Sequence, residues 1–299
     1  MQSRSVIYIL VASLLAVVLL VAATLTWFAT QNPKQLVINA YGSSPYAAMF
    51  LPRQSPLVLS LLVNPDQLEQ FQESVTHDRQ RTQLEWIRLR QGLVAGFDLD
   101  YDQDIQPWLG DELTVAMTAI DLDRDPSNGQ QPGYLVVAAT HDAPRTQEML
   151  ELFWQNQAVA GATLAFEQYK GVQIVSAQPS PSPVAEVASQ PTLQVPARRL
   201  SPLRPTVTNL ATAMVGDQFL LVANHPKVLR EAINAAQARD VGLLESPTYQ
   251  QALQHLTSDR VGLAIVNIAN IAAWAGLNSV APRTAIVSIG LEKQGLHLE

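Results

Sequence analysis

One arrangement recurs along the 299-residue chain: an apolar β-type run, a short polar segment that usually contains proline, and a helical pattern. The apolar runs are residues 57–63, 134–139, 219–223 and 261–266. The polar segments suit helix starts, because Asn or Asp accepts hydrogen bonds from free amides and proline loses no helical bond in the first turn. Apolar residues then recur at three- and four-residue spacings, which gives each helix one face to lay on a sheet.

Further β-type runs lie next to these units, at residues 113–120, 211–215 and 284–291. Strands that come in adjacent pairs and are followed by helices predict an α+β fold. We expect duplicated hairpin–helix units that form an antiparallel or mixed sheet, with the helices on one face. This arrangement differs from a solenoid, because the spacing between copies is irregular.

The units divide the chain into a first α+β unit over residues 36–177 and a second over residues 208–299. Residues 178–207 between them contain seven prolines and predict an extended, flexible insertion. This insertion is a spacer or, alternatively, a docking segment that uses Arg198 and Arg199. The sequence stops within the last predicted hairpin, so we expect the second unit to be part of a longer protein or of a truncated one.

Residues 6–29 form a run of 24 residues without a charge, long enough to cross a membrane as a helix. A cleaved signal peptide is the alternative, but its apolar region is about 7–15 residues long and ends at an A-x-A-like site, which is absent here. We therefore expect residues 1–35 to hold a short cytoplasmic stub and a single-pass anchor. Arg4 before the run and Lys34 after it give a positive-inside signal for a cytoplasmic N-terminus, with the C-terminal domain periplasmic or lumenal.

Composition excludes several classes of function. The chain has no cysteine, which excludes disulfides, thiolate metal sites and a cysteine nucleophile. Its net charge of −7 argues against nucleic acid as a partner, since that role needs a basic face. The common serine-hydrolase, phosphate-loop, dinucleotide and zinc-protease motifs are absent, so we do not expect an enzyme.

Alternating aspartates are the strongest sign of a binding site. The candidate ligands of a cation are Asp98, Asp100, Asp102, Asp104 and Asp111. Alternate carboxylates on an extended loop point the same way, an arrangement that suits Ca²⁺. An EF-hand is excluded, because Ile105 takes the place of its glycine. The alternative is that these side chains, and the similar aspartates in residues 121–125, are solvated turn carboxylates.

Two histidines, His141 and His225, each stand where a strand gives way to a helix. If both lie at the same end of the sheet, they can bind a metal or act as general bases, for example in an Asp142–His225 hydrolase pair. The alternative is that both are polar residues near helix caps.

The segments DIQPWLGDE (Asp104–Glu112), Leu99-Asp100-Tyr101 and LVLSLLVNPDQLE (Leu57–Glu69) resemble cyanobacterial proteins of domain-of-unknown-function family 3352. The resemblance implies a membrane-anchored protein, and it supplies no activity and no site residue. In the residues themselves, Pro107 and Gly110 predict a turn that is anchored by the large apolar surface of Trp108.

These observations predict a membrane-anchored, extracytoplasmic protein that works by interaction with a protein partner, as a scaffold or assembly factor without catalysis. A Ca²⁺-dependent binding module that uses the Asp98–Asp125 region is the alternative, and a hydrolase is the second alternative.

Overall fold

The computed structural model describes residues 45–66, 99–125, 127, 129–178, 209–238, 241–256, 260–274, 284–292 and 295–298. The predicted anchor at residues 6–29, the helix predicted after Asp66 and almost all of the Pro-rich insertion lie outside these residues. None of the helices within the described ranges is long and apolar enough to cross a membrane.

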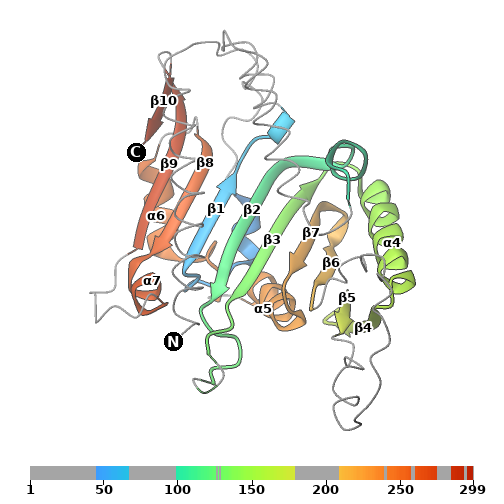
Figure 1. Ribbon diagram of the computed structural model, residues 1–299. Coiled ribbons are helices and arrows are strands. Elements are labelled where there is room, and N and C mark those ends of the chain that lie inside the picture. The colour runs from blue at the N-terminus through green and yellow to red at the C-terminus, as the bar shows by residue number, and fades with distance from the viewer. Residues whose placement is uncertain are drawn as a thin grey trace, which may run out of the picture.

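Ten strands form one sheet in which every pair of neighbours is antiparallel (Figure 1). The strands are β1 (Leu57–Leu61), β2 (Leu109–Ala119), β3 (Gly133–Thr140), β4 (Thr163–Tyr169), β5 (Val172–Gln178), β6 (Ala211–Val215), β7 (Phe219–Ala223), β8 (Arg260–Asn267), β9 (Thr284–Glu292) and β10 (Gly295–Leu298). Their order in space is β10-β9-β8-β1-β2-β3-β7-β6-β5-β4. The α+β class is thus confirmed, and the sheet is antiparallel. Groups of strands that precede the Pro-rich insertion in the sequence alternate in the sheet with groups that follow it. The duplication of units stays a prediction.

In the described part of the chain, four α-helices accompany the sheet: α4 (Ala143–Val159), α5 (Pro226–Gln237), α6 (Pro247–His255) and α7 (Ile268–Trp274). Shorter elements are the 3₁₀ turns η2 (Tyr46–Phe50) and η6 (Gly216–Gln218) and the π-helical turn η3 (Tyr101–Ile105). The predicted first-turn proline is present in α4 and α5, while of these two helices only α4 has the predicted Asp or Asn cap, since Asn224 accepts the amide of Tyr134. Asp142 accepts the amide of Arg145, His225 accepts that of Lys227, and proline stands in the first turn of both helices.

Helices cover both faces of the sheet, so the prediction of helices on one face is wrong. On one face, Leu135 and Leu221 join the main core with Phe50 of η2 and Leu229 of α5. On the opposite face, residues of α4 pack against β5 and β7, with Trp154 fully inside that second cluster. The reason is visible in β3 and β7, whose consecutive apolar residues bury side chains on both faces.

Candidate functional site

The two histidines lie at opposite ends of the sheet, because β3 and β7 are antiparallel neighbours. Ala139 pairs with Phe219 and Leu135 pairs with Ala223, so His141 leaves the sheet where β7 begins. Asn224 lies beside Tyr134, and the seven residue steps from Tyr134 to His141 then separate the two histidines by roughly 20 Å. The shared metal site and the Asp142–His225 hydrolase pair are therefore wrong as predicted.

Each of these two histidines contacts the backbone through its ring. His225 is the N-cap residue of α5, and its Nδ1 accepts the amide of Lys227 at 3.1 Å. Burial, with the positive charges of Arg230 and Lys227, lowers the pKa of His225, which favours the neutral imidazole that can accept this bond. His141 lies with Nδ1 3.0 Å from the carbonyl oxygen of Leu109. The cap interpretation is thus confirmed for His225.

The first aspartate group does not form an extended loop. Asp100 accepts the amide of Gln103 at 3.0 Å, and Asp104 accepts the amide of Asp100 at 2.7 Å, so reciprocal bonds close the turn η3. Asp111 stands exposed on β2, and Asp98 lies outside the described residues. No group of three metal-binding side chains occurs within the described ranges. The extended geometry expected for Ca²⁺ is wrong at η3, and a cation site that includes Asp98 stays a prediction.

The second aspartate group also bonds to its own backbone. Asp123 accepts the amide of Asp125, and Asp125 accepts the amide and the hydroxyl of Ser127 at 2.9 and 2.6 Å. The Ser127 bonds lower the pKa of Asp125. Turn carboxylates of this kind are what the alternative interpretation predicts.

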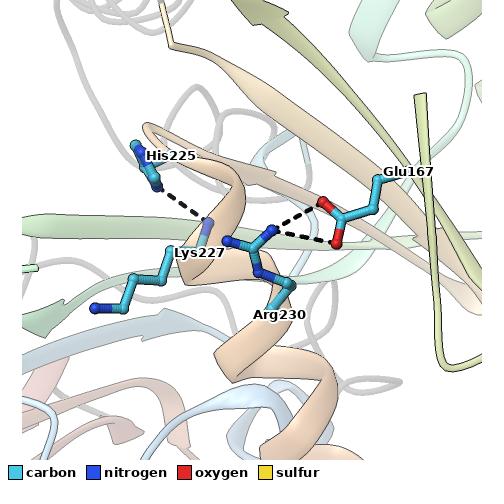
Figure 2. A network of polar contacts seen from close by, with 4 residues as sticks. All are labelled: Glu167, His225, Lys227 and Arg230. Atoms are coloured by element: carbon cyan, nitrogen blue, oxygen red, sulfur yellow. Dashed lines mark hydrogen bonds and ion pairs between the residues drawn. The ribbon is translucent and has the colours of Figure 1, made fainter. Parts of the chain in front are cut away.

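Polar side chains on α5 fall into two groups that point in different directions (Figure 2). The guanidinium of Arg230 holds both carboxylate oxygens of Glu167 on β4, at 2.9 and 3.2 Å. The side chain of Lys227 extends away from that pair, and its ammonium donates to the carbonyl of Leu122. The ion pair of Arg230 with Glu167 connects α5 to β4, whereas the side chain of Lys227 lies beside a pocket.

This pocket, here called the α5 pocket, has a volume of about 540 Å³. Lys227, Glu231 and Asn234 line one side of it, because positions i, i+4 and i+7 share one face of a helix. The other walls come from the loop before β1, the end of β2 with the turn after it, and single residues further on. These residues are Pro52, Gln54, Pro56, Thr118, Ala119, Ile120, Asp121, Leu122, Arg124, Val241 and Asn270.

The pocket combines groups of both charges with amides. Asn270 fixes its rim by donating to the carbonyl of Gln54 at 2.7 Å, and Asp121 accepts the amide of Gln131 at 3.3 Å. The side chains of Glu231 and Arg124 make no hydrogen bond or ion pair within the described part of the chain. One carboxylate and one guanidinium are therefore available to a ligand.

Sequence analysis missed this pocket. The polar residues Lys227, Glu231 and Asn234 are visible in the sequence at a 4–3 spacing on a helix whose other polar residues are Arg230 and Gln237. The residues that face the helix show no such pattern in the sequence. Residues 52–56, 118–124 and 270 are brought to the helix only by the order of the strands in the sheet.

A second polar group, also missed, lies buried between η2 and the sheet. Glu112 is 8% exposed and accepts the amides of Tyr46 at 3.0 Å and Ala47 at 2.9 Å. Burial raises the pKa of Glu112 to about 7, although the two amide bonds act in the opposite direction. Burial and the Glu112 charge also raise the pKa of the Tyr249 hydroxyl, which makes no hydrogen bond in the described structure.

Comparison with known proteins gives a family and no activity. No curated protein and no solved structure matches the chain significantly. A family model described as Protein of unknown function (DUF3352) matches residues 10–299, which is nearly the whole sequence. The chain therefore belongs to DUF3352, a family of proteins of unknown function.

Proposed function

We propose that the protein is a non-catalytic binding protein and that the α5 pocket is its binding site. Residues 6–29 hold it in a membrane, with the larger part of the chain on the extracytoplasmic side. The observation that carries the proposal is the pocket itself. Four parts of the chain that are distant in the sequence, residues 52–56, 118–124, 227–241 and 270, converge on it, and two charged side chains of opposite sign there have no partner among the described residues.

The lining indicates the chemistry of the ligand. Arg124 and Lys227 supply two positive charges, and Asp121 and Glu231 supply two negative ones, so the pocket has no net preference for either sign. A ligand with both charges matches such a lining, whereas a purely anionic or cationic one meets a repelling group. The side-chain amides of Asn234 and Asn270 bond to Tyr169 and Gln54 and keep further donors and acceptors, which suit a peptide backbone. The proposed ligand is thus a peptide segment that carries charges of both signs.

Binding of synthetic peptides to the full chain in detergent micelles tests this proposal. Three pools of fluorescent hexapeptides are compared by anisotropy: one with acidic residues, one with basic residues, and one with both. We expect the mixed pool to bind most tightly, and Glu231→Gln or Arg124→Gln to weaken it roughly tenfold, the effect of losing one charge-assisted hydrogen bond.

Arg145→Gln is the matched control, because Arg145 is an exposed arginine on α4, outside the pocket. This variant should bind the mixed pool as the wild type does. The proposal fails if the three pools bind equally, or if the Glu231 and Arg124 variants are indistinguishable from the control.

A further inference from the structure

Strand β4 forms one edge of the described sheet (Figure 1). Among the described strands it pairs only with β5, through seven consecutive residue pairs from Thr163–Gln178 to Tyr169–Val172 without a bulge. Phe166, at the centre of the strand, leaves 66% of its surface exposed. An edge strand of this length presents a row of unpaired backbone groups that can accept another strand.

Within the described residues, most of the usual protections of an edge strand are missing from β4. Natural edges carry proline, a bulge or charged side chains, especially lysine, are very short, or are covered by a helix or loop. The sequence TLAFEQY has no proline and no lysine, and its one charge, Glu167, is bonded to Arg230 at 2.9 Å. The opposite edge, β10, has four residues. β4 is therefore long and regular, and its one charged side chain already forms an ion pair. These are properties of an edge strand that can pair with another strand.

We propose that β4 pairs with β4 of a second copy of this chain, antiparallel, about a two-fold axis at Phe166. This register is self-complementary, since Phe166 faces Phe166, Ala165 faces Glu167 and Leu164 faces Gln168. No like charges stand opposite one another, and the two central aromatic rings form a favourable cross-strand pair. Because the axis is two-fold, one interface covers the same surface on both copies.

The helix beside this edge supports the same partner. A two-fold axis perpendicular to the sheet keeps corresponding faces on the same side, so α4, which contacts β4, comes beside its symmetry mate. Leu152 and Val159 of α4 are 54% and 89% exposed and, seven residues apart, share one side of the helix. A second copy is the partner that brings matching apolar side chains to that surface.

Cysteine scanning tests the register, because the chain has no cysteine of its own. Thr163, Phe166 and Gln168 are all exposed and are replaced by cysteine one at a time in the membrane-bound full chain. Under mild oxidation, we expect a disulfide-linked dimer for Phe166→Cys, where the two residues face each other. The Thr163→Cys and Gln168→Cys variants should give little disulfide-linked dimer. In this register the two cysteines of each variant lie several residues apart along the paired strands. Equal crosslinking of all three, or of Asp217→Cys on η6, would overturn the proposal.

Mass measurement tests the dimer without a crosslink. Light scattering of the full chain in detergent should give twice the 32.7 kDa of one chain. Phe166→Lys should give a monomer, since it sets two ammonium groups against each other at the axis, while Asp217→Lys leaves the dimer intact. Circular dichroism confirms that both variants are folded. A monomeric wild type, or a dimer that survives Phe166→Lys, contradicts the proposed pairing.

Discussion

The carboxylate of Glu112 accepts the backbone amide of Ala47 at 2.9 Å, joining two residues that are 65 positions apart in the sequence. A second bond, from the amide of Tyr46, completes the attachment of η2 to β2. Helix starts normally satisfy such amides with a local side chain or with water. Here a glutamate that is distant in the sequence accepts these amides in the protein interior. It thereby holds η2, the first described element, against the sheet.

The pH dependence of stability should carry a signature of Glu112. The folded protein holds this proton up to a pKa of about 7, whereas the ordinary value is 4.5. Between these pH values the folded state binds more protons than the unfolded state, so the free energy of unfolding falls as the pH rises. The loss is at most about 3 kcal/mol, from the size of the pKa difference. Urea denaturation at pH 5 and pH 8 measures it.

Glu112→Gln isolates this contribution from those of other titrating groups. The amide oxygen of glutamine still accepts a backbone bond but carries no charge, so the variant should lose less stability than the wild type between pH 5 and pH 8. Glu112→Ala should be less stable by about 1–3 kcal/mol at both pH values, because the amides of Tyr46 and Ala47 lose their acceptor. Identical pH slopes for wild type and Glu112→Gln would contradict the assignment.

Trp154 and Thr212 should show coupled energetics. The indole N–H donates to the threonine hydroxyl at 2.9 Å, and both side chains are buried. Trp154→Phe and Thr212→Val each leave one polar group without this partner, whereas the double variant removes both groups. We expect an interaction energy of about 1 kcal/mol in a double-mutant cycle by chemical denaturation. Simple additivity of the two single effects would show that the bond contributes nothing.

The ion pair between Arg230 and Glu167 should contribute little to stability despite its good geometry. Both side chains are more than one-third exposed, so water and salt screen their attraction. We expect Glu167→Gln to cost no more than about 1 kcal/mol at low salt, and less at high ionic strength. Thermal unfolding at low and high NaCl checks this, with Glu148→Gln on α4 as the control, since Glu148 is an exposed glutamate that makes no ion pair within the described part of the chain. A larger loss that is independent of salt would indicate a role in packing.

Thermal unfolding with EDTA and then with millimolar Ca²⁺ tests the predicted cation site. A site filled at about 100 times its dissociation constant adds about 2.7 kcal/mol, roughly 5–11 °C in the unfolding midpoint. In the structure the carboxylates of Asp100 and Asp104 already accept backbone amides, so we expect a much smaller shift. A full shift that is lost in Asp98→Asn would restore the Ca²⁺ hypothesis.

The sequence predicted the strands that are mostly apolar and missed β4 and β5, which are more polar. Residues 134–139 and 219–223 are apolar runs, and β3 and β7 form there. β4 and β5 contain polar residues at several positions and were not predicted. Their place is set by pairing with each other and with β6, which no local pattern encodes.

The candidate sites were harder to predict for the same reason. His225 was recognised at a strand–helix junction, but its distance from His141 depends on the direction in which β3 and β7 run. Glu112 is a charged residue that follows Asp111 and precedes the apolar run at residues 113–120, and glutamates are usually exposed. Its burial follows from η2, whose amides arrive from another part of the chain.

The position of β1 has a consequence for how the protein is made. β1 pairs with β8, and Leu57 faces Val266, which is 209 positions later in the sequence. A ribosome that adds roughly 5–20 residues per second takes roughly 10–40 s to synthesise the chain between them. Throughout that interval one side of β1 is an open strand edge on a nascent polypeptide, free to join another molecule. The risk of aggregation is thus greatest while the chain is being synthesised. A chaperone that covers β1 until β8 emerges should therefore raise the yield of folded protein.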